Sequence, residues 1–213
     1  MAFGHAGAAL AAAAGFAIGA AGPELASTAQ AAEFTSQYTS ADLKKCRKIG
    51  STKVGDSELG TAWSCPGVAG YVVAVSEDDL RVAVSVGKSV RAAQREPAAS
   101  QSFGPFNFAY ETVEWRSRAG PPFAIIQRWN ISDNAKPGKD GRPGRTALLI
   151  VTRLPPGPVC HVAYVDVAAN PDANVLARQA ADETAARFDC AKDKIRVVGQ
   201  RGRAIELAAD RVQ

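Results

Sequence analysis

The sequence is poor in histidine: it has only two in 213 residues, and His161 is the only one after residue 32. A Ser-His-acid site is therefore possible only through this residue. His161 directly follows Cys160, and neighbours on a strand point to opposite faces, so these two residues do not form a nucleophile–base pair. We expect His161 to be packed or hydrogen-bonded rather than catalytic or metal-binding.

Motifs that bind metals or phosphates are also missing. The sequence has no HExxH, CxxC or GxGxxG motif. Gly55 and Gly60 have the spacing of a phosphate-binding loop, but Thr61 stands where that loop requires lysine. We therefore expect no metal ion and no cofactor. Glu111 and Glu114 are a carboxylate pair, yet this spacing places them on opposite faces of a strand, so they only weakly indicate a hydrolase.

No apolar run is long enough for a comfortable membrane span. The longest, Ala8 to Ala21, is followed by Gly22-Pro23 and then by Ala29-Gln30-Ala31, which fits a signal-peptidase site. We expect residues 1–31 to be a signal peptide. The absence of Lys and Arg before Lys44 departs from the usual pattern of such segments, and a disordered Ala/Gly tail is the alternative interpretation.

The remaining residues, 32–213, are predicted to form a single globular domain with a mildly basic charge. They carry all 25 Lys and Arg against 20 of the 21 acids, which gives +5. Such a charge attracts anionic envelope components without specificity, and it can equally serve solubility alone. We expect no specific nucleic-acid partner and no membrane-spanning segment after cleavage.

Apolar and alternating runs separated by turn residues predict strands through most of this domain. Residues 50–60 are polar and rich in glycine and read as a loop, whereas residues 39–48 read as a helical turn. The predicted fold class is α+β, with an antiparallel β-sheet of about six to eight strands. The predicted strands lie at 61–65, 71–75, 80–86, 111–116, 123–131, 146–154, 159–167 and 195–198.

One long C-terminal helix is predicted from Pro171 to Cys190, after Asn170 as its N-cap. Its stripe of alanines suits close packing on the sheet, against a face that we assign to Cys160, Val162 and Tyr164. A polar tail is predicted from about residue 200, with a weak helical stripe.

The four cysteines, Cys46, Cys65, Cys160 and Cys190, predict two disulfides. The strand leading away from Cys160 covers about 23 Å and the helix returns about 28 Å, so Cys190 arrives near Cys160. Cys46 would then pair with Cys65. The glycine-rich loop between them is flexible enough to allow this pair, but its geometry does not require it. The alternative is four reduced thiols in a cytoplasmic protein.

Two loops are candidates for binding. The segment 133–145 is expected to be a flexible, exposed hairpin loop, and its basic residues are a possible polyanion-binding site: Lys136, Lys139, Arg142 and Arg145. Phe103, Phe106 and Phe108 form an aromatic loop. We favour its burial as a plug at one end of the sheet over a role in contacting a ligand, since scattered aromatic residues usually bury themselves.

A set of short stretches carries a resemblance to known proteins. The stretches are Tyr38–Cys46, Trp63–Gly67, Asp79–Arg81, Val84–Gly87, Val113–Arg116, Cys160–Tyr164 and Ala169–Asn174 with Cys190. They resemble a group of small exported proteins of alphaproteobacteria, most of which have no assigned activity. The resemblance covers most of residues 32–213 and implies a periplasmic or secreted protein.

These features favour a non-enzymatic periplasmic or secreted domain, associated with the cell envelope or binding another protein. One alternative is an exported hydrolase that uses carboxylates. A second is a periplasmic inhibitor that inserts the 133–145 loop into a target enzyme.

Overall fold

The computed structural model describes Gly4, residues 33–54 and residues 57–212. The predicted signal peptide, residues 1–31, lies outside the described residues apart from Gly4. Within the described part of the chain, every helix is too short or too polar to span a bilayer.

Among the described residues, ten strands form two sheets, so the α+β class is confirmed, whereas the single sheet of six to eight strands is wrong. Neighbouring strands are antiparallel except for the parallel pair β9–β10. The first sheet contains, in spatial order, β1 (Phe34–Ser40), β6 (Asn107–Arg118), β7 (Pro122–Asp133), β8 (Gly144–Arg153), β9 (His161–Asp166) and β10 (Arg196–Val197). The second contains β2 (Arg47–Val54), β3 (Ser57–Pro66), β4 (Val72–Asp78) and β5 (Arg81–Gly87).

Two strands, β1 and β2, were not predicted from the sequence. Each lies at the edge of its sheet, with β1 against β6 and β2 against β3. Strands at an edge can be polar, because one of their sides faces solvent. The predicted loop at residues 50–60 is therefore largely a β2–β3 strand pair.

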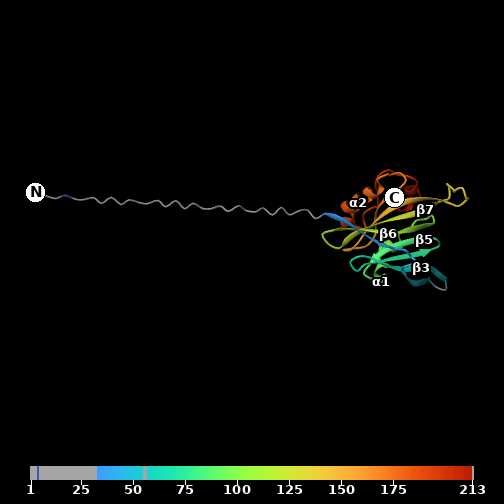
Figure 1. Cartoon of the computed structure of the whole chain (residues 1–213), viewed down its shortest axis with the longest axis horizontal. Coiled ribbons are helices and arrows are strands. Elements are labelled where there is room, and N and C mark those ends of the chain that lie inside the picture. Colours follow the sequence, from blue (N-terminus) through green and yellow to red (C-terminus); the bar gives the residue numbers. More distant parts are fainter. Residues whose placement is uncertain (1–3, 5–32, 55–56, 213) are drawn as a thin grey trace. The chain divides into compact units, whose positions relative to one another are not determined.

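The main core lies between the two sheets. Valines of β4 and β5 meet the inner face of β6, β7, β8 and β9, which carries large aromatic side chains. Trp115, Trp129 and Tyr164 are fully buried there, and Phe103 packs edge-on against Trp129 and Tyr164. Figure 1 shows the order of the layers: α2 (Ala173–Thr184), the six-stranded sheet and then the four-stranded sheet.

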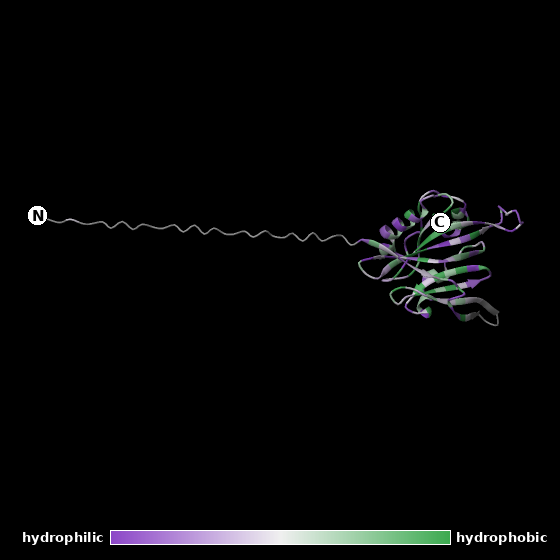
Figure 2. Cartoon of the chain, viewed as in Figure 1, coloured by the Kyte–Doolittle hydropathy of each residue, from purple (hydrophilic) through white to green (hydrophobic). Residues whose placement is uncertain are grey.

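Helix α2 covers part of the outer face of the six-stranded sheet through small residues. Ala173, Ala177, Ala180 and Ala181 are buried against β7, β8 and β9, as the alanine stripe predicted. The hydrophilic side of α2 faces outward (Figure 2). The predicted helix from 171 to 190 is wrong: α2 has 12 residues and is followed by the short 3-10 helix η2 (Ala185–Arg187). The chain then turns, which buries Phe188 in the layer beneath the helix.

A bulge in β9 changes which residues face α2. The β8–β9 register passes from Val151 opposite Ala163 to Thr152 opposite His161, which leaves Val162 without a partner position. Cys160 and Val162 therefore pack under the helix as predicted, whereas Tyr164 turns to the core between the sheets.

The predicted polar tail belongs to the core. Residues beyond 200 form α3 (Arg203–Leu207) and the short helix η3 (Ala209–Arg211), and Ala204, Ile205 and Ala208 are buried. The backbone N–H of Ala204 donates to the buried Asp166 carboxylate at 2.9 Å. The short helices α1 (Val90–Ala93) and η1 (Pro97–Ser100) follow β5.

The two disulfides join the pairs that were predicted. Cys46 and Cys65 bond at 1.98 Å, and Cys160 and Cys190 bond at 1.99 Å. Arg47 lies opposite Ser64 in the β2–β3 register, so Cys46 falls opposite Cys65 on the same strand pair. The second disulfide connects the start of β9 to the chain beyond η2 and holds the helical layer on the sheet.

Candidate binding site

Four large apolar side chains are exposed around one end of the two sheets. They are Leu80 (58% exposed), Tyr110 (45%), Phe106 (39%) and Phe108 (38%). Phe106 and Phe108 lie at the start of β6, and Leu80 lies in the turn between β4 and β5. Phe108 and Tyr110 are ring neighbours, with centroids 5.8 Å apart. Such clustering differs from the scattered single apolar residues that are normal on a protein surface.

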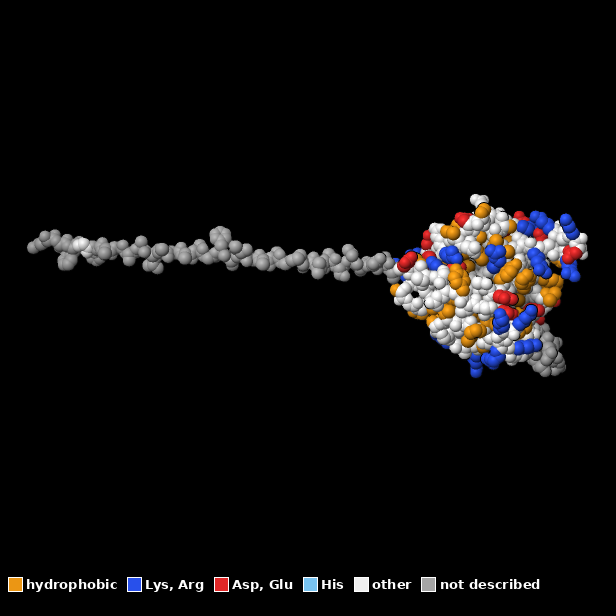
Figure 3. Space-filling model, in the orientation of Figure 1, with side chains coloured by type: hydrophobic (Ala, Val, Ile, Leu, Met, Phe, Trp, Pro, Cys, Tyr) orange, Lys and Arg blue, Asp and Glu red, His pale blue; other side chains and the backbone are white. Residues whose placement is uncertain are grey.

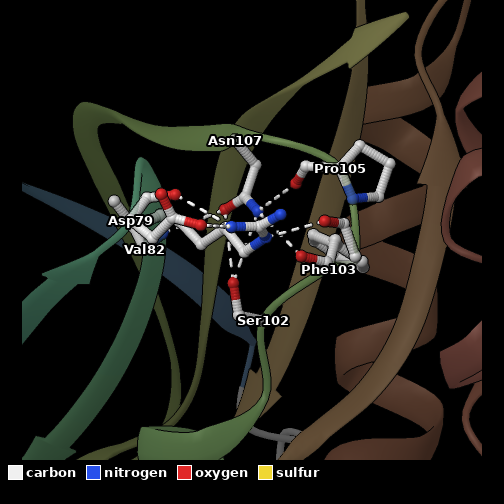
Figure 4. A network of polar contacts seen from close by, with 8 residues as sticks. Asp79, Val82, Ser102, Phe103, Pro105 and Asn107 are labelled. Carbon is white, nitrogen blue, oxygen red and sulfur yellow. Dashed lines mark hydrogen bonds and ion pairs between the residues drawn. The ribbon is translucent and has the colours of Figure 1, made fainter.

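The chain before β6 is held by the buried side chain of Asn107 (Figure 4). Its Nδ2 donates to the carbonyl oxygens of Pro105 at 2.9 Å and Phe103 at 3.3 Å. Its Oδ1 accepts from the backbone N–H of Val82 at 3.1 Å, which ties the segment to β5. These bonds fix the backbone on both sides of Phe106, so its ring is presented on an ordered support.

Arg81 adds a second link between β5 and the same segment. Its Nε donates to the carbonyl of Gly104 at 2.7 Å, and its guanidinium also bonds Asp79. The guanidinium carbon lies 4.9 Å from the centroid of Phe106, a cation–π distance. Asp79 and Leu80 both have positive φ, +46° and +58°, so this tight turn projects Leu80 toward solvent.

A pocket of about 330 Å³ opens between these aromatic residues and the start of β8. Arg145 stands over the ring of Phe108 at 5.3 Å, and Arg142 lies on the rim. The lining residues are Glu77, Leu80, Phe106, Asn107, Phe108, Ser132, Arg142, Pro143 and Arg145. In the space-filling view, apolar and basic side chains lie close together at the end of the domain from which the connection between β7 and β8 projects (Figure 3).

A second hollow of about 390 Å³ adjoins the pocket and shares Phe106 and Ser132 with it. Its far side is closed by the buried Asp133, which accepts two hydrogen bonds of 2.8 Å from Arg203. These bonds hold the pKa of Asp133 below its ordinary value, so the ion pair persists at neutral pH. We call the two hollows together the arginine–aromatic groove, with Leu80, Arg81, Phe106, Phe108, Arg142 and Arg145 as its defining residues.

The four basic residues of the predicted polyanion site lie in two different places in the structure. Arg142 and Arg145 line the groove, whereas Lys136 and Lys139 stand in the exposed connection between β7 and β8 and do not line it. Residues 134–143 are exposed, as expected for a hairpin connection. The aromatic loop divides too: Phe103 is buried as a plug, and Phe106 and Phe108 face the groove. The favoured plug interpretation therefore applies to Phe103 alone.

Leu80 and Arg81 were missed as site residues. In the sequence they follow two aspartates and begin a run of alternating residues, which reads as a turn entering an ordinary strand. The signal that was present is an apolar residue inside an acidic turn. Nothing in the sequence shows that this turn meets residues 104–107.

His161 lies in the core, away from the groove. It is 1% exposed, and its Nδ1 lies 2.9 Å from the hydroxyl of Tyr164. Burial lowers the pKa of His161 to about 3 and raises the pKa of Tyr164 above its ordinary value. A neutral, enclosed imidazole is packed and hydrogen-bonded as predicted, and a substrate cannot reach it in this conformation.

The acids named in the sequence analysis do not converge either. Glu114 is buried in an ion pair with Arg178, whose Nε lies 2.6 Å from its carboxylate, while Glu111 is exposed. Among residues 33–54 and 57–212, no group of three or more His, Cys, Asp or Glu side chains is placed to hold a metal ion.

Comparison of the chain with protein-family models, with curated protein sequences and with solved structures gives no match.

Proposed function

We propose that residues 32–213 form an exported, non-enzymatic binding domain whose ligand is an anionic amphiphile of the cell envelope. The observation that carries this proposal is the arginine–aromatic groove, where Arg81 and Arg145 lie over the exposed rings of Phe106 and Phe108. Among the described residues, Arg145 keeps its donors free for an anionic group, whereas the guanidinium of Arg81 is already bonded to Gly104 and Asp79. The rings and Leu80 offer a surface to an apolar chain.

Export is part of the same proposal. Two disulfides among four cysteines suit an oxidising compartment, because cytosolic thiols are kept reduced. We expect amino-terminal sequencing of the native protein to begin at Ala32. Recovery of an intact Met1 in the cytoplasmic fraction would contradict export.

The binding test uses dodecyl phosphate below its micelle concentration as an anionic probe, with dodecyl maltoside as the neutral comparison. Tryptophan fluorescence or calorimetry at fixed ionic strength measures the affinity. We expect saturable binding of the phosphate form only. Phe106→Ser with Phe108→Ser is expected to weaken it at least tenfold, because the apolar contact is lost.

The four basic residues of the 133–145 segment provide a matched pair of double variants. Arg142→Gln with Arg145→Gln and Lys136→Gln with Lys139→Gln remove the same charge from the same connection. We expect the arginine pair to weaken binding about tenfold and the lysine pair by less than threefold, because only the arginines line the groove. Equal losses from both pairs would show that attraction to net charge, rather than the groove, explains the binding.

The β7–β8 connection favours one second candidate, inhibition of a periplasmic enzyme by insertion of this segment. The connection projects from the end of the six-stranded sheet (Figure 1), and its residues are exposed. An inhibitor of this kind would lose activity in the lysine pair, which lies on the projecting part, and keep its affinity for dodecyl phosphate. Loss of enzyme inhibition in the lysine pair is therefore the result that identifies an inhibitor, and loss of dodecyl phosphate affinity in the arginine pair is the result that identifies the amphiphile-binding domain.

The hydrolase alternative has less support in the groove. Among the described residues, Glu77 is the only acid that lines its first hollow, and Asp133 in the second is bonded to Arg203. A hydrolase of the two-carboxylate type needs one acid to donate a proton and another to activate water or attack.

A further inference from the structure

A separate pocket of about 260 Å³ lies on the outer face of the six-stranded sheet, where α2 begins. Its walls come from β1, β6, β7, β8 and α2, so most strands of this sheet meet the helix there. Arg128 of β7 lines it, together with the buried side chains of Ile126 and Leu149. On β7, Arg128 is four residues from Ser132 of the groove, or roughly 13 Å along the strand.

Arg128 differs from the other arginines that line or adjoin this pocket. Arg178 bonds Glu114, and Arg116 bonds Asp182 through two nitrogens. Within the described part of the chain, the side chain of Arg128 has no hydrogen bond and no ion pair, although it is half-buried. A guanidinium that has lost part of its water without gaining an anion is poised to take one.

Neutral hydrogen-bond donors surround the same space. The hydroxyl of Thr112 and the amide of Asn174 line the pocket, and neither has a side-chain partner among the described residues. The hydroxyl oxygen of Tyr38 accepts a hydrogen bond from Arg178 at 3.1 Å, which leaves its own proton to donate. Glu114 also lines the pocket, but its carboxylate is already bonded by Arg178 and Ser36.

We propose that this pocket binds the carboxylate of a small organic acid. Arg128 pairs with the two oxygens, and Thr112, Tyr38 and Asn174 supply further hydrogen bonds. Two arginines and one glutamate leave the lining with one positive charge, which suits a single anionic group. The planar fork of a guanidinium matches a carboxylate, and Ile126 with Leu149 gives an apolar floor for a short aliphatic chain.

This proposal does not rest on the function proposed for the arginine–aromatic groove, because Arg128 and its neighbours line a different pocket. The groove offers stacked aromatic rings on an open surface. The pocket at Arg128 offers one unpaired cation, neutral donors and two aliphatic side chains. Its ligand is therefore smaller, and its affinity should depend on chain length over only a few carbons.

The test titrates the protein with acetate, butyrate and inorganic phosphate at constant ionic strength, with sodium chloride as the balancing salt. The Nε–H signal of Arg128 is followed by NMR and assigned by its loss in Arg128→Gln. We expect saturable shifts with both carboxylates, and each added methylene that is buried should tighten binding by up to about fourfold. Phosphate binding as tightly as butyrate would overturn the assignment to carboxylates.

Arg128→Gln should weaken butyrate binding at least tenfold, whereas the matched control Arg95→Gln should leave it unchanged. Arg95 is exposed and follows α1, remote in sequence from every lining residue. Unchanged binding in Arg128→Gln, or no saturable response in the wild type, would refute the proposal. If Arg128→Gln does not fold, methyl shifts of Ile126 and Leu149 in the wild type decide the same question.

The source of the carboxylate is resolved by one more probe, a blocked tripeptide with a central glutamate. Tighter binding of the tripeptide than of butyrate supports the site and identifies an acidic protein side chain as the ligand. Tighter binding of butyrate supports the site with a free organic acid as the ligand. Failure of both to shift the Arg128 signal would again refute it.

Discussion

The two faces of the six-stranded sheet are built from different residues for different purposes. The inner face carries Trp115, Trp129 and Tyr164, which are fully buried against the valines of the four-stranded sheet. The outer face meets the alanines of α2 and is only partly covered. Near the end of the helix, Arg116 is paired with Asp182. At the start of the helix, the side chain of Arg128 has no partner among the described residues, and Arg145 stacks on an exposed ring.

This difference indicates that stability and binding are divided between the faces. Large buried aromatic side chains contribute most to the hydrophobic free energy of folding. Exposed arginines and rings contribute little to stability and keep their binding capacity. The following four predictions test that division, beginning with the inner face.

Trp129→Ala should give the largest loss of stability, about 3–5 kcal/mol, because it leaves a cavity between Phe103 and His161. Urea unfolding at pH 7 measures it. Phe108→Ala, on the outer face, is the matched control and should cost clearly less. Equal costs for the two variants would refute the division between the faces.

Cys160→Ser with Cys190→Ser should cost about 3–4 kcal/mol, since the disulfide closes a chain separation of 30 residues. Cys46→Ser with Cys65→Ser, with a separation of 19, should cost slightly less. Amide hydrogen exchange should locate the first effect in α2, which this disulfide holds on the outer face. Faster exchange confined to β4 and β5 would contradict that assignment.

His161 should make the inner face sensitive to acid. Its pKa is about 3 when folded and near 6.5 when unfolded, so below pH 6.5 the unfolded chain binds a proton that the folded chain excludes. Stability should therefore fall by up to about 1.4 kcal/mol per pH unit between pH 6.5 and 3. The slope of the unfolding free energy against pH is measured for the wild type and for His161→Gln, and the difference between the two slopes is the contribution of this residue. Identical slopes would contradict its buried, neutral state.

The smallest effect is expected for Arg142→Gln with Arg145→Gln. Both side chains are exposed at the start of β8, so stability should change by less than about 0.5 kcal/mol. Thermal unfolding measures this change in stability for the arginine pair, with the lysine pair, Lys136→Gln with Lys139→Gln, as the comparison. A loss above about 2 kcal/mol would show that these residues support the fold, and their effect on binding would then need another explanation.

The long apolar runs of the domain were sufficient to predict the central strands. Residues 146–154 and 123–131 became β8 and β7 with small changes at their ends. The Cys160–Cys190 disulfide also followed from local lengths, even though the helix is shorter than expected and ends at Thr184. The length estimate still predicted the correct cysteine pair, because the turns after η2 return the chain to the start of β9.

The groove was predictable only in pieces. The basic residues Arg142 and Arg145 and the aromatic residues Phe106 and Phe108 were each recognised from composition. Their meeting depends on the hydrogen bond from the backbone N–H of Ser132 to the carbonyl of Phe106, which joins the ends of β6 and β7. A pairing between residues 26 positions apart leaves no local pattern in the sequence.

By itself, the sequence determined the elements whose signal is local: the buried strands, the alanine face of α2, the exposed basic connection and the Cys160–Cys190 pair. The tertiary structure alone decided that the strands divide into two sheets, that the polar segment 34–40 pairs with β6, and that residues 203–208 enter the core. Among the described residues, it also left the side chain of Arg128 without a partner beside α2. The physical reason is that burial and pairing are properties of neighbours in space, and these neighbours come from strands and helices far apart in the chain.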